Sequence, residues 1–199
     1  MLTLALDTAT PRSSCALLKG AELLGERETK AASVLAAADA LLVEAGFSAA
    51  DLDQIVCGTG PGSFTGIRIG LAVARGLALA RDLPVAGVST LAALQAAAPD
   101  SLPVIDGSRK EVFTLIDGQP AVIRPEDLEP PSGTLCVGDG AVRYRTLLEA
   151  ADAEVPPDAS ELHLVRARFH ARLATEFGAA ELVEPLYLRI PDAEKALKR

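Results

Sequence analysis

The sequence of 199 residues contains no tryptophan, one methionine, two histidines and three cysteines, and aromatic residues make up 4% of it. With so few aromatic rings, a folded core must pack from alanine and aliphatic side chains. Cys15, Cys57 and Cys136 are far apart and form no CxxC pair. This spacing argues against both a disulfide framework and a zinc site. We expect three buried free thiols in a reducing compartment.

Positive charge and long apolar runs are also scarce. The sequence has 19 Lys and Arg against 27 Asp and Glu, a net charge of -8. Because such a protein repels phosphate backbones, we do not expect it to bind nucleic acid alone. The apolar stretch over residues 66–83 contains Arg68, Arg75 and Arg81, which excludes a membrane span. The N-terminus has no basic segment and reaches Asp7 early, unlike a signal peptide. We expect a soluble cytosolic protein without a membrane partner.

The pattern of apolar residues predicts an α/β fold. Strands alternate with helices along the first half, and Gly46 stands where a helix C-cap glycine is expected. Ser89 or Thr90 provides an N-cap for a later helix. The expected strands cover residues 2–7, 15–20, 22–30 and 84–89, and residues 48–60 are expected to form a short helix or turn that leads into a strand. The expected helices cover residues 31–45 and the segment from the end of the glycine-rich stretch to about Asp82, and a third helix follows Ser89 or Thr90.

One plan occurs twice in the sequence. Residues 4–20 and 102–118 each form an apolar strand ending in aspartate, a polar turn with a basic residue, and an apolar strand ending in glycine. The matching aspartates, Asp7 and Asp106, lie about half a chain apart. This repeat predicts a duplicated two-lobe architecture with mixed β-sheets flanked by helices.

We place the first lobe at residues 1–98 and the second at residues 99–199, with the C-terminal segment packing back across the lobes. The second half is less regular because prolines interrupt it. The expected elements are a proline-rich loop over residues 120–133, a strand near Cys136, a helix over residues 141–151, a long amphipathic helix over residues 160–178 and an extended tail over residues 183–191.

The stretch GTGPGSFTGIRIG, residues 58–70, is rich in glycine and precedes a helix. It is not a Walker A loop, because no lysine occurs between Lys30 and Lys110, and it does not complete GxGxxG. The backbone amides, with Ser63 and Thr65, could hold an anion at the helix N-terminus. Alternatively, the glycines permit a tight turn and close helix–strand packing, with one hydroxyl as the cap. We favour the second interpretation.

Candidate catalytic residues are few. His163 and His170 fall on the predicted late helix without metal-ligand spacing, so we expect them on the helix surface or at a lobe contact. Asp7 and Asp106 either bind a metal or act as a base, or they organise turns by hydrogen bonding. We assign no catalytic or metal residue, and these two aspartates are the weak candidates for a cofactor contact.

Two predicted helices of the first half carry more apolar surface than one core needs. We assign Val34, Leu35, Leu41 and Leu42 of the first helix, and Ile69, Val73, Ala74 and Leu77 of the second, to the core side. The opposite faces, which we predict as a partner interface, hold Ala32, Ala36, Ala40 and Val43 of the first helix and Arg68, Ala72, Arg75 and Leu79 of the second. Such faces indicate either a protein partner or cover by another part of this chain. With a partner, the two helices would form half of a four-helix bundle.

Several segments resemble the bacterial TsaB (YeaZ) family over nearly the whole chain. They are LALDTAT, GTGPGSFTGIRIGLAVARGLALA, GVSTLAAL, VIDGSRKEVF, VGDGAVRY and EPLYLR. The resemblance implies the actin-like/Hsp70-like ATPase (ASKHA) fold with two duplicated lobes. It makes Asp7 and Asp106 look like relics of the phosphate hairpins of that superfamily.

The resemblance also implies a function. Members of this family are non-catalytic partners of the TsaD subunit, which they bind through the first two long helices of the N-terminal lobe. With the ATPase TsaE, the complex transfers a threonylcarbamoyl group to N6 of the adenosine next to the anticodon in tRNAs that read codons beginning with A. ATP and metal then belong to the partner complex, and tRNA is reached through it. The alternatives are a stand-alone ATP-binding enzyme or glycoprotease-like hydrolase of the same fold, and a homodimer formed through the same helices.

Overall fold

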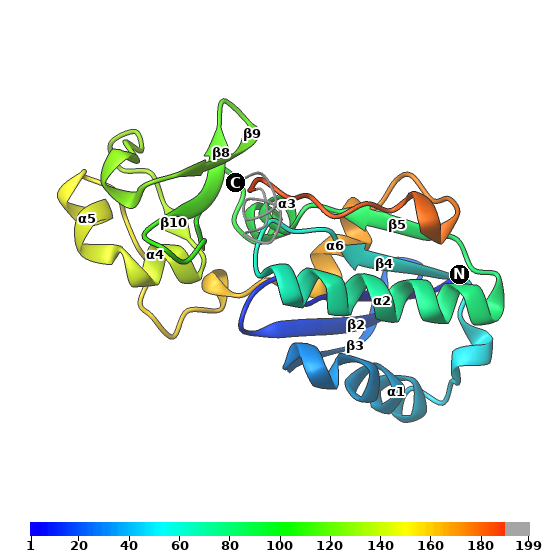
Figure 1. The fold of residues 1–199 in the computed structure, drawn as a ribbon. Helices are drawn as coiled ribbons and strands as arrows, with labels where there is room; N and C mark the ends of the chain where they lie inside the picture. Colours follow the sequence, from blue (N-terminus) through cyan, green and yellow to red (C-terminus); the bar gives the residue numbers. More distant parts are fainter. Residues whose placement is uncertain (190–199) are drawn as a thin grey trace, which may run out of the picture.

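A computed structural model of the chain describes residues 1–189, and its first half forms a five-stranded sheet (Figure 1). The strands lie in the order β3-β2-β1-β4-β5. Strands β1 to β3 are antiparallel neighbours, whereas β4 and β5 continue the sheet in parallel with β1. Their bounds are β1 Leu2–Asp7, β2 Ser13–Lys19, β3 Glu22–Thr29, β4 Gln54–Gly58 and β5 Val85–Val88.

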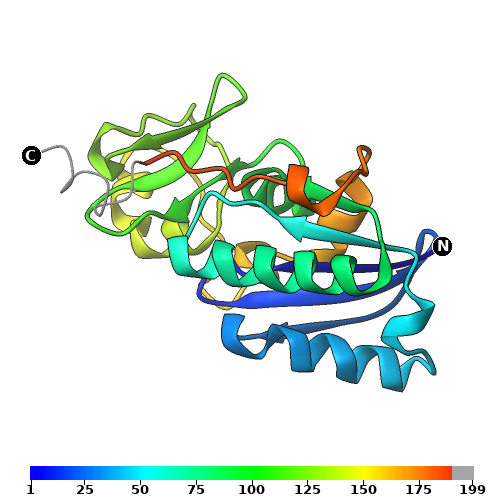
Figure 2. The ribbon, with the colours of Figure 1, turned by 45° about the vertical axis from the view of Figure 1, so that its right-hand side comes forward.

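Helices cover both faces of this sheet. Helices α1 (Val34–Glu44) and α2 (Phe64–Arg81) lie on one face, and α6 (Ala167–Leu173) packs on the other face against β1 and β2 (Figures 1 and 2). Helix α3 (Thr90–Ala97) begins directly after β5, with the hydroxyl of Ser89 accepting a hydrogen bond from the Ala92 amide. Short 3-10 turns at Ala31–Ser33 and Ala49–Asp51 flank α1.

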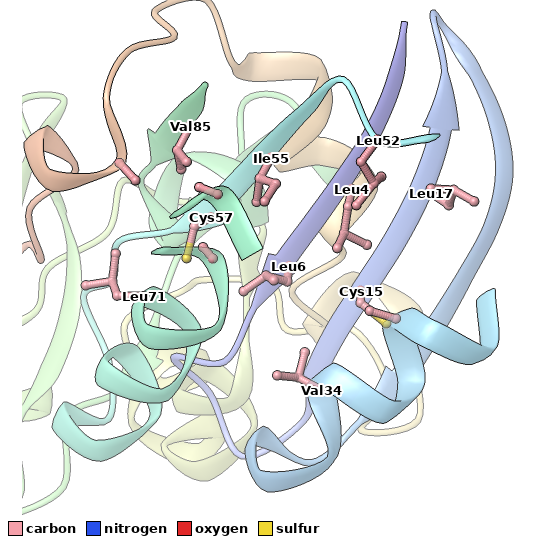
Figure 3. Packing of buried hydrophobic residues seen from close by; sticks show 14 of the residues in the cluster. Leu4, Leu6, Cys15, Leu17, Val34, Leu52, Ile55, Cys57, Leu71 and Val85 are labelled. Carbon is pink, nitrogen blue, oxygen red and sulfur yellow. The ribbon is translucent and has the colours of Figure 1, made fainter. Parts of the chain in front are cut away.

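The alternation along β1 and β2 separates two cores of different character. Leu4 and Leu6 point toward α1 and α2, together with Cys15 and Leu17 of β2 (Figure 3). Ala5, between the two leucines, belongs to the core under α6. Because side chains of a strand alternate between faces, the leucines of β1 share one face while Ala5 lies on the other. On that face the alanines of β1, β2 and β5 lie beside Leu18, Val56 and Val88 under α6.

The second half repeats the strand plan of the first. Strands β7, β8 and β9 form an antiparallel sheet, and β6 pairs in parallel with β10. Since β6 and β7 follow one another along the chain, the order β9-β8-β7/β6-β10 matches the order β3-β2-β1-β4. The bounds are β6 Leu102–Pro103, β7 Ile105–Asp106, β8 Val112–Ile116, β9 Gln119–Ile123 and β10 Cys136–Val137. The predicted duplicated α/β fold is confirmed, while the lobe boundary after residue 98 stays a prediction.

The prediction of one long amphipathic helix over residues 160–178 is wrong. The structure has a 3-10 turn at Glu161–His163 and then α6, which ends at Leu173. Between them the backbone is extended, with ψ of 131° at Leu164 and 122° at Arg166. The apolar residues that suggested a helical face lie in an extended segment, where their side chains are buried by tertiary contacts.

Two smaller predictions in the second half also need correction. The proline-rich loop over residues 120–133 contains most of β9 and a 3-10 turn at Pro125–Asp127. Pro120 is tolerated because β9 is an edge strand, where a missing N–H removes no ladder bond. The helix expected over residues 141–151 is two short helices, α4 (Asp139–Arg143) and α5 (Arg145–Ala150), which meet at Tyr144. The last residues of the predicted lobe and tail, 190–199, lie outside the described residues.

The glycine-rich stretch is shaped by contact with the turn after β1. A Cβ atom at Gly66 would lie 2.0 Å from the backbone oxygen of Thr8, and one at Gly70 would lie 2.4 Å from the Thr8 hydroxyl. The Thr8 hydroxyl donates to the Gly66 carbonyl at 2.7 Å, and the Ser63 amide donates to the Ala9 carbonyl at 2.7 Å. The glycines therefore let α2 lie directly against this turn, which agrees with close packing.

We predict opposite effects for two alanine substitutions in α2. Gly66→Ala should lower the free energy of unfolding by about 2 kcal/mol or more, because the backbone of Thr8 leaves no room for the methyl group. Gly76→Ala should raise it by roughly 0.5–1 kcal/mol, because no atom lies within 4 Å of its Cβ position and alanine favours helix. Urea denaturation of both variants tests this, and equal effects would contradict the packing role.

Candidate partner surface and cleft

Asp7, at the end of β1, is buried among groups that occupy both of its oxygens. Its Oδ1 accepts a hydrogen bond from the Ala9 amide at 2.8 Å. Its Oδ2 accepts one from the Thr90 hydroxyl at 2.7 Å and lies 2.9 Å from Nε2 of His170. Asp7 is 1% exposed and His170 is not exposed at all. The carboxylate of Asp7 therefore organises structure and does not face a cleft.

The charge state of Asp7 follows from these contacts. Burial alone raises the pKa of its carboxyl group. The hydrogen bond and the charge of His170, with the hydrogen bonds from Thr90 and the Ala9 amide, outweigh burial and hold the pKa below its ordinary value of 3.8. Asp7 is thus ionised in the folded protein at neutral pH.

Asp106, the matching residue at the end of β7, lies in a different environment. Its carboxylate pairs with Arg143 at 2.6 Å and accepts a hydrogen bond from the Ser108 amide at 3.0 Å. Its own amide donates to the carboxylate of Asp139 at 3.0 Å. Burial raises the pKa of Asp139, and the neighbouring Asp106 charge adds to this effect. The two aspartates singled out by the sequence are not brought together, since only Asp106 lines the cleft described next.

A cleft of about 700 Å³ lies between the glycine-rich stretch, the turn after β7 and the C-terminal segment. Ser63 and Thr65 border it from the start of α2, and Arg68, Arg109 and Arg189 bring positive charge. The hydroxyl of Ser63 accepts a hydrogen bond from the Gly66 amide and so serves as the N-cap of α2. The predicted cap is therefore present, and it engages one of the two hydroxyls, Ser63 and Thr65, that the anion hypothesis used.

The outer face of α1 is exposed, as the wheel assignment predicted for most of its residues. Ala32, Ala36 and Val43 are exposed, the last at 67%, and Ala40 is half-buried. The assignment of Leu35 to the core side is wrong, because this side chain is 50% exposed. It lies one position beyond Val34, which is the residue that turns toward the sheet, so Leu35 adds to the apolar surface.

The outer face of α2 is exposed as well, but its arginines have partners within the chain. Ala72 is exposed and Leu79 is 82% exposed. Arg75 donates a hydrogen bond to the Val183 carbonyl at 2.7 Å, and Arg68 donates one to the Tyr187 hydroxyl at 3.1 Å. These two contacts could not be predicted from the sequence, because each arginine and its partner are more than a hundred positions apart.

The two flanks of α2 therefore differ. Arg68 and Arg75 mark the flank next to the C-terminal segment, whereas α1 lies along the other flank (Figures 1 and 2). Ile69 and Val73, which we assigned to the core side, are half-buried and pack against the core under α1 and α2, so this assignment is confirmed.

The histidines and cysteines are buried. His163 accepts a hydrogen bond from the Gly138 amide through Nδ1, and its Nε2 lies 3.1 Å from the Pro156 carbonyl oxygen, so a surface position on a helix is wrong for both histidines. All three cysteines are buried and free, as expected. Burial raises the pKa of Cys15 to about 11 and also raises the pKa of Cys57, which suppresses thiolate chemistry.

No metal-binding cluster and no membrane-spanning helix occurs among residues 1–189. No group of three or more His, Cys, Asp or Glu side chains is arranged to hold a metal ion within this range. In the same part of the chain, no helix combines the length and the apolar character that crossing a bilayer requires.

Comparisons with known proteins place the chain in a family. The family model described as TsaD, tRNA N6-adenosine threonylcarbamoyltransferase, matches residues 28–130. An uncharacterized protein of Mycobacterium tuberculosis is 38% identical over 209 residues, covering 96% of this chain and 93% of that protein. The tRNA threonylcarbamoyladenosine biosynthesis protein TsaB of Escherichia coli is 42% identical over 97 residues, covering 46% of this chain and 41% of that protein. YeaZ from Pseudomonas aeruginosa superposes with a TM-score of 0.75 at 29% identity, over 94% of this chain and 99% of that chain.

The chain belongs to the TsaB family. The fold is also shared with the ethanolamine utilization protein EutJ from Carboxydothermus hydrogenoformans, at a TM-score of 0.51 and 11% identity. The predicted ASKHA fold is confirmed. In this TsaB homologue, the glycine-rich stretch that carried the resemblance runs from the end of β4 into the first turns of α2, next to the turn that follows Asp7.

We predict that Asp7 makes stability depend on pH in the acid range. Because its pKa is lowered by folding, its contribution is complete above the ordinary value of 3.8 and is lost as the pH falls through the folded-state pKa. Asp7→Asn should lower the free energy of unfolding at pH 7 by roughly 3–5 kcal/mol and remove this part of the pH dependence.

Urea denaturation between pH 2 and pH 7 measures the effect, with Asp117→Asn, at an exposed turn position, as the control. If both variants keep the acid dependence of the parent protein, the contacts of Asp7 do not carry it.

Proposed function

We propose that this protein is a non-catalytic subunit that binds a TsaD-type catalytic subunit and is required for N6-threonylcarbamoylation of tRNA. The proposal extends what its relatives are named for, tRNA threonylcarbamoyladenosine biosynthesis. In this role the protein acts in the cytoplasm, where it meets its partner, a TsaE-type ATPase and tRNA. ATP and metal are used by the partner complex.

The observation that carries the proposal is the exposed apolar face of α1 and α2. Leu35, Val43 and Leu79 are between 50% and 82% exposed, although they belong to the two helices that cover one face of the first sheet. The exposed small residues Ala36 and Ala72 belong to the same two helices and would let another helix approach closely. Exposed apolar side chains on neighbouring helices are typical of protein interfaces. A second helix pair laid across it would complete a four-helix bundle.

The state of Asp7 supports a role without catalysis. A carboxylate that binds a metal or takes a proton needs an oxygen that faces its substrate. Both oxygens of Asp7 are used within the protein, and the side chain is buried. The serine at the start of α2, Ser63, caps the helix and has no histidine among its hydrogen-bond partners.

The rival hypothesis is an independent enzyme, either an ATPase or a hydrolase. One solved relative, from Pseudomonas aeruginosa, is described as similar to peptidase YeaZ, with 30% identity and a TM-score of 0.73. The cleft lined by Arg68, Arg109 and Arg189 is where such an activity would have to occur. This hypothesis requires turnover by the isolated chain, which separates it from the subunit role.

Direct binding of tRNA by this chain is not favoured. The arginines near β3 are neutralised by glutamates, because Arg12 pairs with Glu28 and Arg168 pairs with Glu26. The net charge of -8 also disfavours binding to a phosphate backbone. We therefore assign tRNA contact to the complex.

We predict that Ala36→Glu abolishes association without unfolding the protein. Ala36 is exposed in the free chain, so the fold tolerates the carboxylate, whereas burying that charge between helices would cost several kcal/mol of binding energy. The measurement is light-scattering mass after mixing with the TsaD-type protein of the same genome, with and without ATP. Ala151→Glu, at an exposed position after α5, is the matched control and should associate normally.

Three results would contradict the proposal. The parent chain fails to form a hetero-complex, Ala36→Glu binds as well as the parent, or the isolated chain hydrolyses ATP and loses this activity when Arg189 is changed to glutamine. The last result would move the function into the cleft and support the enzyme hypothesis.

A further inference from the structure

The last part of the described chain wraps around the first sheet. We call residues 165–189 the C-terminal clasp. It begins behind the sheet with α6, passes the β5 edge and reaches the flank of α2 on the opposite face, along the orange-to-red path in Figures 1 and 2. At the edge, Gly178 and Val85 exchange two backbone hydrogen bonds, of 2.9 and 3.1 Å. The clasp therefore connects the back of the sheet with α2.

Behind the sheet, the clasp is held by buried polar contacts. The contact between His170 and Asp7 is the most enclosed of these, with side-chain exposures of 0% and 1%. The carbonyl of Val165 accepts a hydrogen bond from the buried Ser14 hydroxyl at 2.9 Å. Arg168 adds an ion pair with Glu26 at 2.6 Å. Because separating His170 from Asp7 would leave the buried carboxylate without one of its partners, we expect this contact to contribute most to holding the clasp.

On the face of α2, the same segment holds residues that belong to the proposed partner surface. The Leu186 amide donates to the Thr59 carbonyl at 2.8 Å and fixes the clasp beside the glycine-rich stretch. Tyr187 accepts the hydrogen bond from Arg68 and lies against Phe64, with ring centroids 5.1 Å apart. The Val183 carbonyl holds Arg75. The clasp thus sets the positions of both guanidinium groups on α2.

We propose that the clasp pre-organises the partner surface of α2, and that the buried Asp7–His170 pair keeps the clasp in place. This inference rests on the proposed function and names what regulates its binding surface. Arginine side chains lose considerable rotamer freedom when an interface orders them. Contacts that order Arg68 and Arg75 before binding remove that cost and raise affinity without adding any contact to the partner. Opening of the clasp at the back of the sheet then weakens binding on the front.

The test uses the full-length chain with His170→Leu. We expect the backbone amides of Gly178 and Leu186, which donate hydrogen bonds to Val85 and Thr59, to exchange hydrogen for deuterium faster by about tenfold or more. Amides of β8 and β9 should keep their exchange rates. Affinity for the purified TsaD-type subunit, measured by calorimetry, should fall by about tenfold or more.

A second variant guards against a general loss of folding. Gly178→Pro removes one hydrogen bond at the β5 edge and leaves the Asp7–His170 pair intact, so it loosens the clasp by a different route. It should also weaken partner binding. If Leu186 exchanges faster in a folded variant while affinity stays at the parent value, the inference is overturned, and unchanged exchange in His170→Leu overturns the role of the pair.

The outcome for the proposed function is separate. A parent chain that binds its partner, together with an Ala36→Glu variant that does not, upholds the proposed function even when the clasp variants bind normally. A parent chain that fails to bind contradicts the proposed function itself.

Discussion

The contact on which most of this structure depends is the buried cluster of Asp7, Thr90 and His170. It joins the end of β1, the start of α3 and the middle of α6, three elements from distant parts of the sequence. A charged carboxylate can stay in such a core only because each of its oxygens has a partner. Because both oxygens of Asp7 are already engaged, neither is free to contact a bound ligand. The same contacts thus stabilise the fold and keep Asp7 out of catalysis.

The close approach of α2 to the turn after β1 is the second constraint. Gly66 and Gly70 bring the helix within backbone contact of Thr8, and this places α2 beside α1 over the leucine-lined face of the sheet. The outer faces of both helices remain open as a consequence. A stretch that looks like a phosphate-binding loop in sequence therefore acts mainly by positioning a helix. The exposed apolar face of α1 and α2 is therefore a consequence of how the inner faces of these helices pack on the sheet.

The sequence allowed the first-half strands and helices to be predicted, because the apolar strand that ends at Asp7 and the cap candidates Ser89 and Thr90 are local signals; the structure assigns the cap to Ser89. It also identified Ala36 and Val43 as surface residues, since α1 follows ideal helical periodicity. His170 could not be paired with Asp7, because nothing local marks a contact between residues at opposite ends of the chain. The helix predicted around His170 was too long for a related reason. Leu164 and Val165 are buried by tertiary contact in an extended backbone, and their apolar character imitates a helical face.

The path of the clasp has a consequence for how the protein is made. Asp7 is synthesised early, but its partner His170 leaves the ribosome only after most of the predicted second lobe. At about 5–20 residues per second, roughly ten to thirty seconds of translation separate the two residues. During that interval the alanine-lined back of the first sheet has no α6 to cover it. Until α6 is synthesised, this apolar face of the nascent first lobe stays uncovered. Uncovered apolar surface of a partly folded chain favours misassembly.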